Sequence, residues 1–155
     1  MNEEDLESLI RYIVSEARNL FEKHTDQKDA KVHYCCVFSQ SDGEFEKLNV
    51  AVNGIGGRIL KETPTGPMYQ IQPIETVAGA LRILKIRKPD PTRPERGDAD
   101  FAVSNYPEFK EKCLGRLGFN LIEREDFEMI ELMDTDFNVR AYFSNPPVEE
   151  QYDLN

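Results

Sequence analysis

Two histidines and three cysteines limit the nucleophilic and proton-transfer chemistry available to this chain of 155 residues. His33 stands two residues before Cys35, so a histidine-activated thiol is one interpretation of the run KVHYCCV. The alternative is that Cys35, Cys36 and Cys113 are small apolar residues in a reducing compartment. Strand neighbours point to opposite faces, so Cys35 and Cys36 are poorly placed to bridge each other. We expect the structural role for all three.

A second candidate group consists of arginines set among apolar residues. Arg82 lies in ALRILKI and Arg140 in NVRAYF, and both stretches are typical of strands. A guanidinium group inside a sheet is costly unless it pairs with an acid or binds an anion. The two arginines therefore predict a clamp on a carboxylate or phosphate, the alternative being that both lie on a solvated face.

A third candidate group is the pair of carboxylates in DADFAV, Asp98 and Asp100. Side chains two residues apart on a strand share a face, so the pair stays together whatever the register. Both could serve a site on that face, or could simply bond the nearby Arg93 and Arg96.

The elements that must position these residues follow from hydrophobic periodicity. Residues 3–23 carry one apolar stripe at helical spacing. After it the pattern predicts a strand, a helix and three strands, at 31–39, 41–57, 58–63, 68–72 and 80–88, and then the same order at 98–103, 104–118, 119–125, 127–133 and 139–144.

Capping signals support the two predicted internal helices. Ser41 and Glu44 have capping-box spacing, and Asn105 is a candidate N-cap. The inner stripe of the second of these helices is predicted to include Cys113 and Leu117.

The repeated order predicts an α+β fold with two βαβββ modules in a single domain, 1–155. Its parts are an N-terminal helix (1–26), a first module (31–88), a Pro-rich crossing (89–97), a second module (98–144) and a tail (145–155). The tail reads as a poorly anchored end, although Val148, Tyr152 and Leu154 could dock. The alternative is an α+β sandwich without internal symmetry.

Two βαβββ modules in one chain resemble the vicinal oxygen chelate superfamily of glyoxalases, extradiol dioxygenases and bleomycin-resistance proteins. KVHYCCV is similar to its opening strand, GGRILKETPTGPMYQI to the hairpin of a first module, and LMDTDFNVRAYF to the closing hairpin. The likeness covers roughly residues 31–144 and is closest to a branch with a leading helix. It implies curled mixed sheets around a central cavity.

The resemblance also implies a site in that cavity. The first-strand ligand positions of the family correspond to His33 and to Asp98 or Asp100, which would suit one divalent ion such as zinc, iron, manganese or nickel. The family's last-strand glutamate is missing, and Glu131 is the nominated third ligand. We expect His33 and Asp100 to converge as a catalytic proton-transfer pair.

The composition limits the classes of binding partner that we expect. The net charge of −10 argues against nucleic acid and anionic membranes. No apolar run approaches the roughly 18 residues of a membrane span, and the acidic start is no targeting peptide, so the expected location is cytoplasmic. We expect a monomer or homodimer.

The expected function is the binding of a small anionic molecule, with Arg82, Arg140 and Tyr69 in contact with it. The enzyme hypothesis is a metal-dependent lyase, isomerase or oxygenase. The alternatives are a non-enzymatic small-molecule binding module and a protein-interaction module. The incomplete ligand set fits a binding module better than a metalloenzyme.

Overall fold

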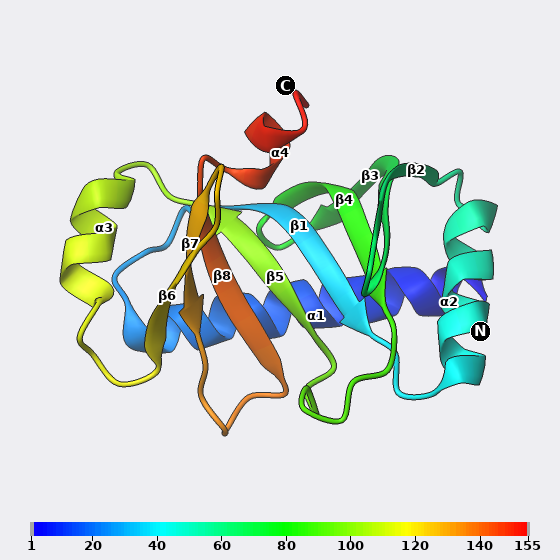
Figure 1. The fold of residues 1–155 in the computed structure, drawn as a ribbon, viewed down its shortest axis with the longest axis horizontal. Helices are drawn as coiled ribbons and strands as arrows, with labels where there is room; N and C mark the ends of the chain where they lie inside the picture. The colour runs from blue at the N-terminus through cyan, green and yellow to red at the C-terminus, as the bar shows by residue number, and fades with distance from the viewer. Residues whose placement is uncertain (1, 155) are drawn as a thin grey trace.

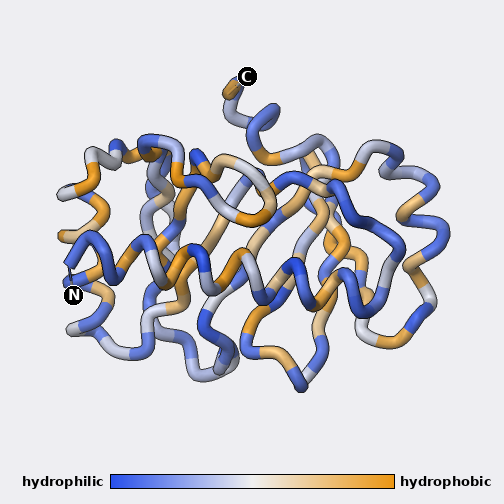
Figure 2. The backbone as a smooth tube through the Cα atoms, turned by 180° about the vertical axis from the view of Figure 1, so that it is seen from behind, coloured by the Kyte–Doolittle hydropathy of each residue, from blue (hydrophilic) through white to orange (hydrophobic). Residues whose placement is uncertain are grey.

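Helix α1 (Glu3–His24) covers one face of the sheet in the structure, a computed structural model that describes residues 2–154. The helix begins with a reciprocal capping box between Asn2 and Asp5. Its apolar stripe is buried along the whole length and consists of Leu6, Ile10, Ile13, Val14, Ala17, Leu20 and Phe21. Figure 1 shows α1 running behind the central strands, and Figure 2 shows it from the other side with hydrophobic and hydrophilic positions alternating. The predicted leading helix is confirmed.

Two βαβββ modules follow α1, as predicted. The first consists of β1 (Lys31–Phe38), α2 (Asp42–Gly54), β2 (Arg58–Thr63), β3 (Gly66–Thr76) and β4 (Gly79–Arg87). The second consists of β5 (Gly97–Ala102), α3 (Tyr106–Cys113), β6 (Phe119–Glu123), β7 (Glu128–Leu132) and β8 (Val139–Asn145), and a short helix α4 (Val148–Gln151) ends the chain. The predicted caps form, since the backbone N–H groups of Glu44 and Glu108 donate to the side chains of Ser41 and Asn105.

All eight strands form one mixed sheet in the order β2-β3-β4-β1-β5-β8-β7-β6. The modules join where β1 and β5 pair antiparallel at the centre. Each of these two strands also pairs in parallel with the last strand of its own module, β1 with β4 and β5 with β8. Helices α2 and α3 lie at opposite ends of the molecule (Figure 1). The α+β class with paired modules is therefore confirmed.

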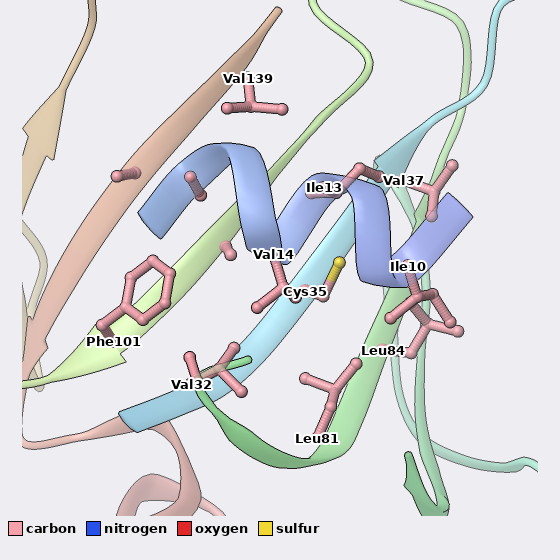
Figure 3. Packing of buried hydrophobic residues seen from close by; sticks show 14 of the residues in the cluster. Ile10, Ile13, Val14, Val32, Cys35, Val37, Leu81, Leu84, Phe101 and Val139 are labelled. Atoms are coloured by element: carbon pink, nitrogen blue, oxygen red, sulfur yellow. The ribbon is translucent and has the colours of Figure 1, made fainter. Parts of the chain in front are cut away.

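The main core lies between α1 and the central strands. Ile10, Ile13 and Val14 pack against side chains of β1, β4 and β5 (Figure 3). Gly97 permits this close approach, because a Cβ atom there would lie 2.3 Å from the carbonyl oxygen of Cys36 and 2.7 Å from Cδ1 of Ile13. A side chain at the start of β5 would therefore clash with both β1 and α1.

Strand β1 divides its side chains between the two faces of the sheet. Val32, Cys35 and Val37 belong to the core under α1. The register shifts between Val32 and Tyr34, so a bulge interrupts the simple alternation at the position of His33. Beyond the bulge, the odd-numbered positions Cys35 and Val37 face α1, and their even-numbered neighbours face the other side.

The cysteines, the end of α3 and the tail each test a prediction. All three cysteines are buried and unpaired, in agreement with a structural role. The prediction that Leu117 belongs to the inner stripe is wrong, because α3 ends at Cys113 and Leu117 is 97% exposed. The tail is better anchored than predicted, since Val148 is buried against Met68 and Ile83 and forms a second apolar cluster with Tyr152 and Leu154. None of the helices between residues 2 and 154 is long and apolar enough to cross a membrane.

Packing beneath α1 predicts a large effect for Phe21→Ala. The Phe21 ring is fully buried, and its centroid lies 4.8 Å from that of Phe101 and 5.6 Å from that of Phe143. We expect the free energy of unfolding in urea to fall by about 3–5 kcal/mol, because truncation leaves a cavity between α1 and the sheet. Tyr12→Ala, on the exposed side of the same helix, should change it by less than about 0.5 kcal/mol. Equal losses in the two variants would contradict this packing.

Candidate functional site

Strand register gathers polar side chains of both modules on the face opposite α1. Cys36 on β1 pairs with Lys85 on β4 and with Asp98 on β5. Asp98 in turn pairs with Arg140 on β8. Residues that pair across neighbouring strands share a face. Because the adjacent Cys35 packs under α1, this row of four lies on the other side of the sheet.

A second row runs parallel to the first, two residues further along β5. Tyr34 pairs with Asp100, Asp100 with Tyr142, and Tyr142 with Glu131 on β7. The two rows place both aspartates at the junction of the modules, Asp100 between Tyr34 and Tyr142 and Asp98 between Cys36 and Arg140. Asp98 and Asp100 therefore share a face, as the spacing predicts.

Five residues of these rows, Tyr34, Lys85, Asp98, Asp100 and Tyr142, line a cavity of about 270 Å³, smaller than the cavities typical of drug-sized ligands. Val148, Gln151 and Tyr152 of the C-terminal segment line one side of it. The remaining lining consists of Tyr34, Met68, Lys85, Arg87, Arg93, Asp98, Asp100, Arg124, Phe127, Met129, Tyr142 and Ser144. Six of these lining residues are charged, so the cavity is more polar than most small-molecule sites, which apolar side chains predominantly line.

Asp98 is the least satisfied group in this cavity. It is 7% exposed, and its Oδ1 has no hydrogen-bond partner within the described part of the chain. Burial, together with the neighbouring carboxylate of Asp100, raises the pKa of Asp98 to about 7. The positive charges of Arg93 and Lys85 oppose this rise. Asp98 can therefore gain or lose a proton near neutral pH.

Asp100 is buried as deeply but has its own partner. Its carboxylate accepts hydrogen bonds from the backbone N–H of Ser144 at 3.1 Å and from the Ser144 hydroxyl at 2.5 Å. Burial raises the pKa of Asp100 to about 7, and the two hydrogen bonds act in the opposite direction. Ser144 thus holds the second carboxylate in a fixed orientation.

Three cations line the cavity from β4 and from the Pro-rich crossing. Lys85 donates to Thr65 Oγ1 at 2.6 Å, and burial lowers the pKa of its ammonium group. Arg87 and Arg93 both face Asp90, with N–O distances of 3.4 and 3.8 Å. The crossing is therefore more than a connection between modules, since it brings Arg93 to the cavity.

Arg140 is held by two carboxylates beside this cavity. Its guanidinium group lies 3.1 Å from Glu95 and 3.3 Å from Glu131, and all three side chains are largely buried. Tyr142 also donates to Glu131, at 2.5 Å. Glu131, the nominated third metal ligand, is thus engaged by an arginine and a tyrosine.

His33 and Arg82 lie together under α4. Arg82 pairs with Glu149 at 2.6 Å, and the backbone N–H of Glu149 donates to Nδ1 of His33 at 3.4 Å. Burial lowers the pKa of His33, against the opposing effect of Glu149. Arg82 and Arg140 stand on β4 and β8, which β1 and β5 separate, and the register places Arg140 level with Lys85, three residues beyond Arg82 on β4.

The predicted site residues therefore fall into several places. Asp98 and Asp100 line the cavity, whereas His33 is not part of its lining. Tyr69 packs in the core on the α1 side and donates to Asn49 on α2 at 2.5 Å. Among residues 2–154, no three His, Cys, Asp or Glu side chains are grouped closely enough to hold a metal ion. The donors present do not fit a resident divalent metal.

Several cavity residues are missing from the sequence-based prediction. Lys85 and Arg93 line the cavity, as do Tyr34 and Tyr142. The signal for part of this set is present in β8, where Arg140, Tyr142 and Ser144 alternate with apolar residues. No comparable pattern marks Arg93, because its position depends on how the crossing folds over the sheet.

A larger hollow, about 530 Å³, lies between the end of α1 and the start of α3. Its charged side chains find partners at short range: Lys23 and His24 contact Asp134, and Lys112 contacts Glu108. Unlike the cavity between the modules, it is walled by surface ion pairs. We therefore place the candidate site between the modules.

Comparison with known proteins finds similar folds but gives no information about the chemistry of the site. No protein-family model and no curated protein matches this sequence. A solved structural-genomics protein, EC4020, has a similar fold, with a TM-score of 0.67 over 97% of this chain and 88% of that chain at 13% identity. At such low identity the likeness shows the fold alone.

Two other solved structures bear on the predicted resemblance. A glyoxalase/bleomycin resistance protein/dioxygenase superfamily member from Vibrio splendidus 12B01 covers 74% of this chain and 97% of its own at 9% identity and a TM-score of 0.47. Methylmalonyl-CoA epimerase from Streptomyces coelicolor covers 75% and 98% at 12% identity and a TM-score of 0.41. These scores are too low to support an argument by themselves. The observed order of elements, however, agrees with the predicted resemblance in fold.

The buried charge of Asp98 predicts an unusual pH dependence of stability for Asp98→Asn. The folded-state pKa of about 7 lies above the ordinary value of 3.8 for an aspartate, so ionisation opposes folding. This cost is absent below pH 4, grows between about pH 4 and 7, and is complete above pH 7. Each unit of pKa difference corresponds to about 1.4 kcal/mol. We expect the variant to melt at a higher temperature than the parent at pH 8, by roughly 3 °C or more, with a smaller difference at pH 5.

Asp126→Asn is the matched control, because Asp126 is exposed. Its melting temperature should follow that of the parent at both pH values. A melting temperature of Asp98→Asn below that of the parent at pH 8 would show that the carboxylate stabilises the fold.

Proposed function

We propose that the cavity between the two modules binds a small anionic molecule. The observation that carries this proposal is the convergence of Lys85, Arg87 and Arg93 on a cavity of about 270 Å³, in a chain whose net charge is −10. Ammonium and guanidinium groups form charge-assisted hydrogen bonds with carboxylates and phosphates, which are stronger than neutral ones. Inside a partly buried cavity, such bonds are screened less by salt.

The roles of the cavity residues follow from their positions. Lys85 and Arg93 would hold the anionic group, and their bonds to Thr65 and proximity to Asp90 would orient them before the ligand enters. Met68 and Met129 would cover its apolar part. The C-terminal segment, docked through Val148, would limit the access of water. The volume of the cavity limits the ligand to a small molecule.

Proton transfer, as in a lyase or isomerase, is the second candidate function. The observation that favours it is a pair of buried carboxyls, Asp98 and Asp100, whose pKa values lie near 7. A group of this pKa can act as base or acid at neutral pH. Of the two, Asp98 lines the cavity without a hydrogen bond from a neighbouring side chain to its Oδ1 among the described residues, so it is the nominated proton acceptor.

Anion binding is tested by isothermal titration with inorganic phosphate and small mono- and dicarboxylates. We expect saturable binding by the parent protein, weakened roughly tenfold or more in Lys85→Met and Arg93→Met through loss of a charge-assisted bond. Lys47→Met, at an exposed position on α2, should bind as the parent does. Absence of saturable binding to any of these anions, or equal affinity in all variants, would contradict the proposal.

Proton transfer is tested by hydrogen exchange in heavy water. The acids that bind should lose the proton on the carbon next to the carboxylate faster with the protein than without it, as followed by proton magnetic resonance. Asp98→Asn should abolish the acceleration, because an amide cannot take up that proton. Exchange that continues at the parent rate in this variant would exclude Asp98 as the base.

A further inference from the structure

Asp98 differs from the other charged groups of the cavity in having a free acceptor. Asp100 accepts from Ser144, and Lys85 donates to Thr65. Arg93 lies near Asp90 and over the ring of Phe38, 5.7 Å from its centroid. Only the Asp98 carboxylate combines deep burial, an oxygen without a donor and a place in the cavity wall within the described residues.

A buried acceptor without a donor costs folding free energy. The Asp98 carboxylate therefore has room for a hydrogen bond that a ligand could donate. The neighbouring carboxylate indicates what kind of donor would form this hydrogen bond. Asp100 is satisfied by the hydroxyl of Ser144 on the adjacent strand. A hydroxyl or amino group of a ligand would do the same for Asp98.

The cations of the cavity lie close enough to act on the same ligand. Cys36 pairs with Lys85 on one side and with Asp98 on the other, so Lys85 and Asp98 are two strands apart. Their backbones are therefore roughly 10 Å apart, and long side chains narrow this gap. Arg93 also lies in the electrostatic field of Asp98. A molecule of a few carbon atoms can thus span the distance between the cations and the Asp98 carboxylate.

We infer that the ligand of this cavity is a small bifunctional molecule, an oxyanion with a hydroxyl or amino group on a nearby carbon, and that the Asp98 carboxylate accepts a hydrogen bond from that group. This inference rests on the proposed anion binding and specifies its substrate class. An anion without the donor would leave Asp98 unpaired and would add a like charge beside it. A site built to bond a hydroxyl or N–H group discriminates strongly against analogues that lack it.

The test compares matched acids by isothermal titration at pH 8: propionate, lactate and alanine, and then succinate, malate and aspartate. In the parent protein we expect at least tenfold tighter binding of a hydroxy or amino acid than of the unsubstituted acid. The hydroxy and amino members separate the two possible donors. Asp98→Ala removes the acceptor, so the preference should fall to about onefold while the unsubstituted acid binds at least as well as before.

Asp98→Asn refines the result, because it keeps an acceptor oxygen and removes the charge. It should retain part of a preference for the hydroxy acid and lose a preference for the amino acid. Binding of the unsubstituted acid by each variant reports that its cavity is intact. Asp126→Ala, at an exposed site, should keep the parent preferences.

The outcomes separate this inference from the proposed function. If the three members of each series bind equally to the parent, or if Asp98→Ala keeps the preference, the role of Asp98 is overturned and anion binding stands. If none of the six acids binds and phosphate does not bind either, the proposed function fails, and the inference fails with it.

Discussion

The antiparallel pairing of β1 with β5 is the interaction on which the rest of this structure depends. It joins the two modules, and α1 packs across it on one face. On the other face it brings Tyr34 and Cys36 opposite Asp100 and Asp98. A strand has only two faces, so the same register that buries Cys35 under α1 commits its neighbours to the cavity. The core and the candidate site are two consequences of one alignment.

The polar face of the sheet is tolerated because its charges support one another. Arg140 is held between Glu95 and Glu131, and Asp100 is bound by Ser144. Buried charges that have partners rigidify their surroundings, whereas a buried charge without one weakens the fold. Asp98 is the group in which the cavity departs from this rule, and binding sites are where such departures are expected.

The internal repeat has a geometric consequence that the order of elements along the chain does not reveal. Arg82 and Arg140 occupy corresponding strands of the two modules, which favours a shared clamp. Because the antiparallel strands β1 and β5 stand between β4 and β8, the two arginines are three strands apart, and Arg140 is level with Lys85 rather than with Arg82. Equivalent positions of the two modules therefore lie close together only near the β1–β5 junction. Asp98 and Asp100 lie there and meet Tyr34 and Cys36, whereas each arginine meets a local glutamate.

Hydrophobic periodicity and capping residues by themselves determined the helices, the strands and their repeated order, because these depend on neighbours a few residues away. The shared face of Asp98 and Asp100 follows for the same reason. Only the tertiary structure decided the bulge at His33, the docking of Val148 and the place of Arg93 over the cavity. Each depends on contacts between segments far apart in the chain, where one residue of register or the path of a loop decides which groups meet.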